Sequence, residues 1–87
     1  MLGMKKLSVT PVVAFGRALR RLRLTAPLTQ EQLGLESGVA RTFISQIELG
    51  QHQPTISTIF RLAEALKVKP SKLVSEAEKI VAGEQEA

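Results

Sequence analysis

Residues 28–54 of the chain read LTQEQLGLESGVARTFISQIELGQHQP, and this stretch decides the fold. Thr29 stands three residues before Gln32, which is the spacing of a capping box at the start of a helix. Gly38 fits a position with positive φ just after the helix, where a side chain would be strained. The pattern therefore predicts a short helix over residues 30–36, closed by a tight glycine turn.

A second helix is predicted over about residues 40–49, ended by Gly50. On a helical wheel of about 100° per residue, its apolar side chains occupy one arc and its polar side chains the other. Phe43, Ile44 and Ile47 form the apolar arc, which we expect to anchor the helix to the core. The outward stripe of the N-terminal half consists of Arg41, Thr42, Ser45 and Gln46.

The outward stripe has the chemistry that reads the edges of DNA bases. Arginine can donate two hydrogen bonds to guanine O6 and N7, and glutamine can pair with adenine N6 and N7. Serine is permissive, and a threonine or alanine methyl can contact a thymine methyl. The alternative is a merely solvated helix face, but a position on the second helix of a helix-turn-helix favours base reading. The predicted base contacts are Ala40, Arg41, Thr42, Ser45 and Gln46.

Further motifs extend this unit almost continuously from Arg23 to Leu73. They are Arg23, Leu28-Thr29-Gln30, Leu33, Gly38-Val39, Ile44-Ser45, Ile47-Glu48, Gly50, Pro54, Leu62-Ala63 and Leu66. Together they resemble the lambda-repressor and Cro type of helix-turn-helix proteins, often called the XRE family. Residues 41–45 are similar to restriction-modification controller proteins in particular, and small antitoxins share the pattern. The resemblance implies an all-α fold, a five-helix lambda-repressor-like DNA-binding bundle.

The resemblance also implies which side chains approach the DNA backbone. Gln30, at the start of the first motif helix, is expected near a phosphate. The loop after the recognition helix is expected there too, through Gln51, His52, Gln53 and the following Thr55. Polar groups and helix N-termini make such contacts and fix the register without reading sequence. On the preceding helix, Arg17 and Arg21 are candidate phosphate contacts, with simple solvation as the alternative.

A structural ion pair between Arg23 and Glu48 follows from the same family pattern. On the helical wheel, Glu48 lies at the edge of the core face, where a carboxylate is unfavourable unless it is paired. We therefore interpret the pair as a link between the first helix and the recognition helix. No nucleophile or metal-ligand cluster stands beside Glu48 in the sequence to suggest catalysis.

Besides Pro27, which replaces the glycine that is common before Leu-Thr-Gln, two residues depart from the family pattern. Ala40 occupies a position that is usually a Ser, Thr or Asp cap, and alanine is a poorer cap by about 1 kcal/mol. Leu35 sits where the family is normally polar, so it either packs on Leu24 or Leu28 or forms an exposed apolar contact. Neither departure removes the predicted reading surface.

The composition also indicates which kind of ligand the protein binds. The 87 residues carry a net charge of +4, and residues 1–30 contain six Lys or Arg and no acidic residue. A basic region of this kind suits a polyanionic partner such as double-stranded DNA. Aromatic residues make up only 3% of the chain, which argues against nucleic-acid binding through stacked bases.

The same composition gives no sign of catalysis, a cofactor or a membrane. The chain has no cysteine and a single histidine, His52, so no metal site is expected. No catalytic constellation is visible, and we expect neither enzymatic activity nor a cofactor. No apolar run approaches the length of a transmembrane helix or a signal peptide. We expect a bacterial or phage protein of the cytoplasm, associated with the nucleoid.

The flanking regions complete the predicted domain, residues 10–82. Thr10 as cap and Pro11 as first helical residue start the first helix, and Thr55 caps a helix over 56–66. Pro70 opens a last helix that extends to Ala82. We expect residues 1–9 to be flexible and residues 83–87 to be disordered.

The last predicted helix carries apolar residues beyond the family core. We expect Ala77, Ile80 and Val81 to form a dimer interface, the alternative being a tail that covers its own domain. The leading hypothesis is thus a homodimeric transcriptional regulator, which binds an inverted repeat and either blocks or contacts RNA polymerase. An antitoxin or protein-interaction module, with secondary or lost DNA binding, is the alternative.

Overall fold

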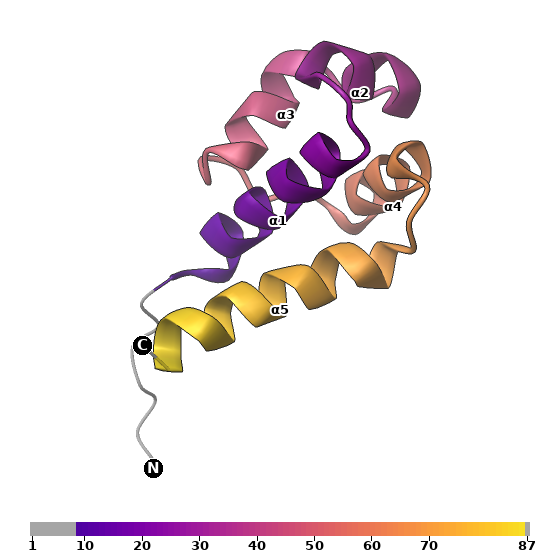
Figure 1. Ribbon diagram of the computed structural model, residues 1–87. Helices are drawn as coiled ribbons and strands as arrows, with labels where there is room; N and C mark the ends of the chain where they lie inside the picture. The colour runs from indigo at the N-terminus through magenta and orange to yellow at the C-terminus, as the bar shows by residue number, and fades with distance from the viewer. Residues whose placement is uncertain (1–8, 87) are drawn as a thin grey trace.

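Five α-helices make up residues 9–86, the part of the chain that the computed structural model describes, with side chains placed for 9–83 (Figure 1). The helices are α1 (Pro11–Thr25), α2 (Gln30–Ser37), α3 (Arg41–Glu48), α4 (Ile56–Leu66) and α5 (Pro70–Glu86). Residues 9–86 contain no β-strand. The predicted all-α, five-helix fold is confirmed.

The helix starts follow from local hydrogen bonds that the sequence predicts. Thr10 and Thr55 cap α1 and α4, because each side-chain oxygen accepts the backbone N–H three residues downstream, at 3.3 and 3.2 Å. At α2, the Gln32 N–H donates to Thr29 Oγ1 at 3.0 Å, while the Thr29 N–H donates to Gln32 Oε1 at 2.9 Å. The capping box is complete, and it satisfies two N–H groups that the helix leaves free.

Two glycines with positive φ bound the recognition helix. Gly38 has φ of 75° in the turn after α2, and its N–H donates to Gly34 O at 2.9 Å. Gly50 also has φ of 75°, and follows α3. There, the N–H groups of Gly50 and Gln51 donate to Ile47 O and Gln46 O, a Schellman motif that closes the helix end.

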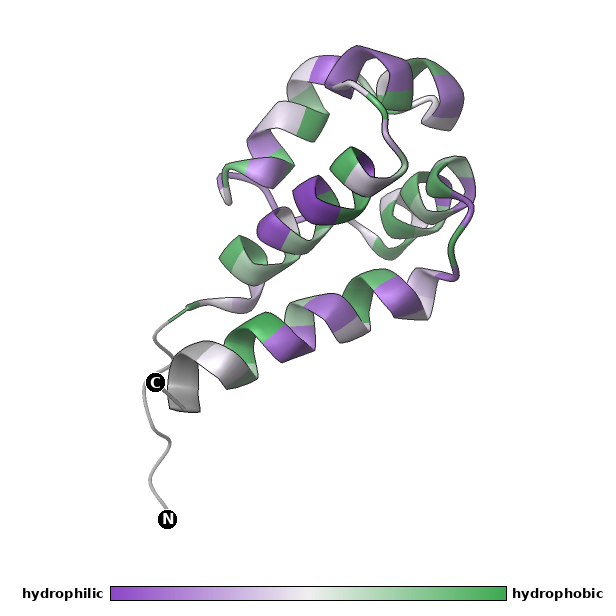
Figure 2. Ribbon diagram, in the orientation of Figure 1, coloured by the Kyte–Doolittle hydropathy of each residue, from purple (hydrophilic) through white to green (hydrophobic). Residues whose placement is uncertain are grey.

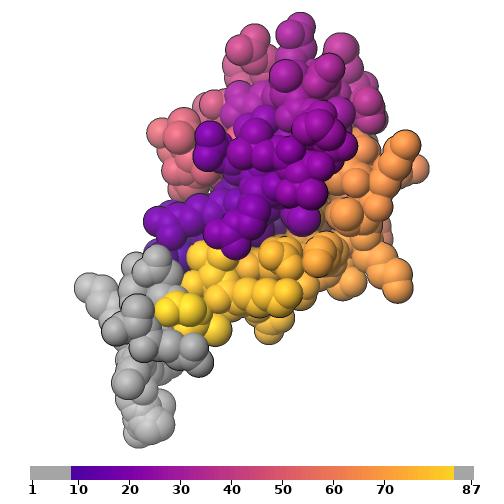
Figure 3. Space-filling view, viewed as in Figure 1, coloured from indigo at the N-terminus to yellow at the C-terminus, as the bar shows by residue number. Residues whose placement is uncertain are grey.

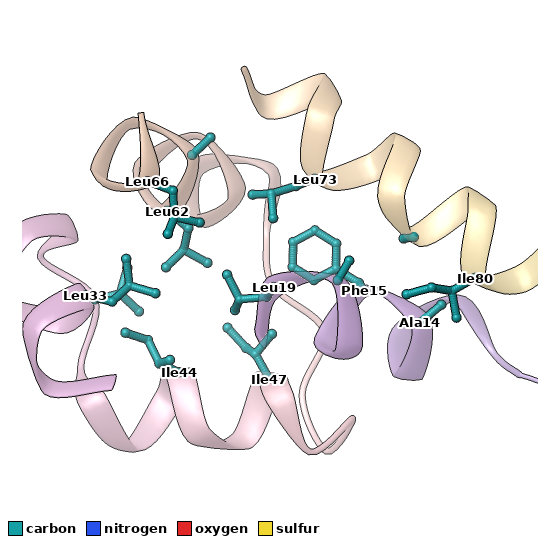
Figure 4. Close-up of a cluster of buried hydrophobic side chains, with 14 of the residues drawn as sticks. Ala14, Phe15, Leu19, Leu33, Ile44, Ile47, Leu62, Leu66, Leu73 and Ile80 are labelled. Atoms are coloured by element: carbon teal, nitrogen blue, oxygen red, sulfur yellow. The ribbon is translucent and has the colours of Figure 1, made fainter. Parts of the chain in front are cut away.

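The core forms where the apolar faces of all five helices meet. Figure 1 shows α1 between α3 and α5, and Figure 2 shows that the helices carry both hydrophobic and hydrophilic residues. Figure 4 shows the side chains that fill the centre. Those that are fully buried and largest are Leu19, Leu33, Ile44, Ile47, Leu62 and Leu73. Because α3 contributes two of these residues, packing in the core stabilises this helix in addition to the glycine turns at its ends.

Both chain ends differ from the sequence expectation. Val9 is buried in the core cluster, so the predicted flexible segment 1–9 is wrong at that residue, while 1–8 lie outside the described residues. At the other end, α5 continues through Glu86 and does not stop at Ala82, so the predicted disorder of 83–87 is wrong over 83–86. Glutamate and glutamine favour helix, and no proline interrupts the segment.

The expected dimer interface also needs correction. Ala77 and Ile80 are only 8% and 9% exposed, because α5 packs along α1 and both residues join the core. Figure 4 shows Ile80 directed toward α1 at Ala14. Val81 is half-buried against the same core. Within one chain, Ala77 and Ile80 are therefore covered by the domain's own core, and only Val81 of the three leaves part of its side chain uncovered.

A close backbone contact fixes the position of α3 on α1. A Cβ atom at Gly16 would collide with Ile47 O and would lie 2.9 Å from Glu48 O. These atoms are backbone carbonyls near the end of α3, which cannot move as the tip of a flexible side chain can. The absence of a side chain at Gly16 therefore sets how closely the two helices approach.

We predict that Gly16→Ala lowers the free energy of unfolding by about 1–3 kcal/mol, because overpacking forces the helices apart. Urea denaturation followed by circular dichroism measures this change. Gly83→Ala is the matched control, since Gly83 is also helical but a Cβ there meets no atom within 4 Å. The control should be neutral or more stable, by up to about 1 kcal/mol. Equal stability of the Gly16 variant and the unsubstituted protein would contradict the contact.

Candidate nucleic-acid interface

The recognition helix presents a polar stripe opposite its buried side. Ile44 and Ile47 are fully buried, whereas Arg41, Thr42 and Gln46 are exposed. This alternation follows the helical period, so the predicted division of α3 into two faces is confirmed. Figure 3 shows α2 and α3 at one end of the molecule, with α5 running along the other side of α1. The stripe therefore lies on an outer face that no other helix covers.

The two remaining residues expected to read bases differ from this pattern. Ser45 is half-buried, so it offers less of its side chain to a ligand than its neighbours do. Ala40 is exposed and is the N-cap of α3, but it makes no side-chain hydrogen bond to the helix. The first-turn N–H groups of α3 thus have no capping acceptor from the residue that precedes them.

The loop after α3 is oriented by a contact that the sequence did not predict. The rings of Phe43 and His52 meet edge to face, with centroids 5.0 Å apart and an interplanar angle of 69°. Phe43 is half-buried and packs against the core, as the sequence predicted, and its ring edge also meets His52. The contact holds His52 beside the recognition helix. Its neighbours Gln51 and Gln53 are exposed, and Gln53 lies at the edge of a groove lined by α1, α4 and α5.

A hydrogen-bonded cluster joins α1, α2 and α3. Arg23 Nε donates to Glu48 Oε2 at 2.6 Å, and Arg23 Nη2 donates to Glu48 Oε1 at 2.9 Å. Arg23 Nη1 also donates to Leu28 O at 2.8 Å. The two charged side chains are only 8% and 3% exposed. The predicted ion pair is thus present as a two-point contact of the kind that guanidinium and carboxylate groups form best.

The electrostatics of this cluster favour the charged guanidinium. Its hydrogen bonds to Glu48 raise the pKa of Arg23 above the usual value, and they outweigh the opposing effect of burial. The Arg23 guanidinium therefore keeps its charge although it is buried. Such a contact positions the recognition helix and does not itself face a ligand.

Gln30 belongs to the same cluster, which the sequence did not indicate. Its Nε2 donates to Glu48 Oε1 at 3.0 Å, and the side chain is half-buried. The expected phosphate contact of Gln30 would thus come from a group that is already oriented by Glu48. Being the first residue of α2, Gln30 also has a backbone N–H without a partner inside the helix.

The other expected phosphate contacts lie on two elements. Arg17 and Arg21 are exposed on α1, where with Arg20 and Leu24 they line a shallow depression. Thr55 is exposed, but its hydroxyl serves as the cap of α4 and also meets the Thr58 hydroxyl at 3.1 Å. The structure therefore leaves the arginines as the more accessible candidates.

Among the large apolar side chains of residues 9–83, Leu35 is the most exposed, at 79%. Of the two possibilities that the sequence left open, packing on Leu24 or Leu28 is thus wrong. Residues 9–83 contain no group of three or more side chains that could hold a metal ion. None of the described helices has the length and apolar character needed to cross a bilayer.

Comparison with known proteins places this arrangement in a family. The family model described as helix-turn-helix (HTH_3) matches residues 19–73, which cover the end of α1 through the start of α5. The chain belongs to this family. The predicted resemblance to XRE-type helix-turn-helix regulators is thereby confirmed.

Curated relatives cover most of the chain. An uncharacterised HTH-type transcriptional regulator, y4dJ of Sinorhizobium fredii, is 38% identical over 60 residues, which are 69% of this chain and 78% of the relative. The control protein C.BamHI of Bacillus amyloliquefaciens is 36% identical over 61 residues, covering 69% and 75% of the two chains.

Solved structures agree in fold. The restriction-modification controller protein C.AhdI of Aeromonas hydrophila is 39% identical, with a TM-score of 0.70 over 71% of this chain and 94% of its own. The clp gene regulator ClgR of C. glutamicum gives a TM-score of 0.81 over 88% and 99%, at 23% identity. The second similarity supports the fold alone.

We predict that Glu48→Ala destabilises the domain by about 3–5 kcal/mol, because it leaves the Arg23 guanidinium buried without its partner. Thermal and urea unfolding measure the loss. Glu76→Ala is the matched control, since the Lys72 and Lys79 side chains that pair with this carboxylate are themselves exposed and remain solvated without it. Solvent screens that contact, so the control should leave the urea midpoint almost unchanged. Similar losses in the two variants would contradict a buried structural pair.

Proposed function

We propose that this chain is a sequence-specific, double-stranded DNA-binding transcriptional regulator that lays α3 in the major groove. The observation that carries the proposal is the exposed stripe of Arg41, Thr42 and Gln46 beside fully buried Ile44 and Ile47. A core-anchored helix fixes the backbone from which its outer side chains project, so no backbone has to be ordered when those side chains meet base edges. The family supports the same use of the helix.

Phosphate contacts would fix the register of α3 on the duplex. The exposed loop of Gln51, His52 and Gln53 follows α3, and the edge contact between Phe43 and His52 holds His52 against that helix. The N-terminus of α2 with Gln30, together with the arginines of α1, offers further donors. Such groups position the protein and carry no base information.

A homodimer on an inverted repeat is part of the proposal. One small module buries about 600–1,000 Å² of protein surface on DNA, which limits specific affinity. A two-fold partner repeats the contact on a half-site about 34–36 Å away, or a multiple of that distance. The regulator would occupy a promoter and act there by excluding RNA polymerase or by contacting it.

Selection of bound sequences from a random duplex pool tests the whole proposal. The expected result is an enriched, palindromic motif whose half-sites repeat at the helical period of DNA. Recovery of unselected sequence would overturn base reading. Enrichment of a motif without symmetry would retain base reading but overturn the dimeric site.

We predict that Gln46→Ala and Arg41→Ala each lose about 1–3 kcal/mol of binding at the selected site and relax the base preference there. Fluorescence anisotropy against site variants measures both effects. Arg61→Ala is the matched control for Arg41→Ala, because it removes the same charge from an exposed position on α4. Equal losses in the two arginine variants, or equal losses on random duplex, would contradict base reading.

We also predict a strong dependence of DNA binding on salt. The logarithm of the association constant should fall by about 0.9 per neutralised phosphate for each unit of log salt concentration. Arg21→Ala should reduce that slope by about one and weaken all sequences alike, because it removes a phosphate contact. Titrations at several salt concentrations measure the slope. If Arg21→Ala leaves the salt slope unchanged, Arg21 of α1 does not contact a phosphate.

A further inference from the structure

Leu49 is a large apolar side chain that the core does not use. It is 66% exposed and directly follows Glu48, the last residue of α3. Its backbone is still helical, with φ of −85° and ψ of 0°, and its N–H donates to Ser45 O at 3.0 Å. The direction of the Leu49 side chain is therefore set by the same helical period as the rest of α3.

This period places Leu49 in the middle of the outward face of α3. At about 100° per residue, Leu49 lies about 40° from Ser45 and about 20° from Thr42 on the helical wheel. The buried residues Ile44 and Ile47 lie on the opposite side, and Figure 4 shows both directed from α3 into the centre of the domain. The polar stripe thus has an apolar member at its C-terminal end.

The side chain of Leu49 restricts what it can contact in the major groove. Leucine has no side-chain donor or acceptor, so it cannot hydrogen-bond to a base edge or to a phosphate. Of the groups that bases present in this groove, the 5-methyl group of thymine is the apolar one. A hydrocarbon side chain and a methyl group are attracted because their contact removes apolar surface from water. The residue type and its position on α3 therefore favour a thymine methyl as the partner.

We propose that Leu49 is a specificity-determining residue, which reads a thymine through its 5-methyl group in the major groove. This inference rests on the proposed function, because the contact requires α3 to lie in that groove. It adds a base contact at the C-terminal end of α3, beyond the residues 40–46 from which base reading was predicted. The contact favours thymine over cytosine, since cytosine presents an amino group and no methyl group there.

The length of α3 limits where this thymine lies in the half-site. Leu49 is eight residues after Arg41, which corresponds to a rise of about 12 Å along the helix axis. Successive bases of one strand are about 3.4 Å apart along the axis of the duplex. The thymine is therefore expected within about four base pairs of the base pair that Arg41 contacts.

A methyl-deletion scan of the half-site selected from the random pool tests the inference without any change to the protein. Each thymine is replaced in turn by deoxyuridine, which keeps the hydrogen-bonding groups of the base and removes only the methyl group. At one position near the Arg41 contact, the unsubstituted protein should lose about three- to fivefold in affinity. Fluorescence anisotropy measures the loss. A half-site in which no such replacement weakens binding would overturn the inference.

The variant Leu49→Ala assigns the sensitive methyl group to its partner. This variant should bind the thymine site more weakly and should no longer distinguish it from the uracil site, as in a double-mutant cycle of contacting groups. Leu49→Met should retain the distinction, because methionine keeps an apolar side chain of similar volume. If every effect of uracil persists in Leu49→Ala, the methyl contacts belong to other residues and the inference is wrong.

The matched control is Leu35→Ala. Leu35 is also an exposed leucine of a helix, but it lies on α2, outside the polar stripe. The control should keep the ratio of thymine-site to uracil-site affinity that the unsubstituted protein shows. Loss of this ratio in the control as well would contradict a specific contact of Leu49.

The dependence of binding on salt separates a base contact of Leu49 from an effect on phosphate contacts. Leu49 carries no charge, so Leu49→Ala should weaken binding at the selected site and leave the salt slope unchanged. Arg21→Ala, by contrast, is expected to reduce the slope. A reduced slope in Leu49→Ala, or an equal loss on random duplex, would show that Leu49 does not read a base.

Failure of this inference can be distinguished from failure of the proposed function. A protein that enriches a motif and loses its preference through Gln46→Ala, but shows no methyl effect coupled to Leu49, refutes the role of Leu49 alone. A protein that enriches no sequence from the random pool refutes base reading by α3, and with it the contact of Leu49.

Discussion

The docking of the last turn of α3 on α1 is the constraint on which the reading surface depends. Gly16 allows the carbonyls of Ile47 and Glu48 to reach the α1 backbone. The carboxylate of the same Glu48 takes two hydrogen bonds from Arg23. Beyond it, a Cβ at Gly50 would lie 2.8 Å from Val13 Cγ2, so this turn is also pressed against α1. An eight-residue helix is not stable alone, and these contacts compensate for its length.

Sequence predicted what is governed by near neighbours. The caps at Thr10, Thr29 and Thr55 depend on a residue and the next turn, and Gly38 and Gly50 depend on backbone conformation. The contact at Gly16 could not be predicted in the same way, because a glycine inside a helix has no local signature of what approaches it. The apolar period of α5 likewise identifies a buried face but not the element that covers it, which is why Ala77 and Ile80 were assigned to a partner.

In the candidate site too, the features set by neighbouring residues were predictable, and the contacts between residues far apart in the sequence were not. The period of α3 predicted which side chains leave the core, and only Ser45 is less exposed than expected. The packing of His52 on Phe43 and the hydrogen bond from Gln30 to Glu48 join residues that are nine and eighteen positions apart. Neither the helical period nor turn chemistry encodes such contacts. They nonetheless decide how the loop and the N-terminus of α2 stand beside the stripe.

Ala40 shows where folding stability and ligand affinity make opposite demands on one residue. An aspartate there would cap α3 and interact favourably with the positive end of the helix dipole. It would also put a negative charge at the end of a helix proposed to enter a groove bordered by phosphates. Alanine has no side-chain oxygen, so Ala40 gives the first-turn N–H groups of α3 no capping acceptor. Selection for thermal stability alone would therefore favour aspartate at position 40, and the resulting protein would bind nucleic acid more weakly.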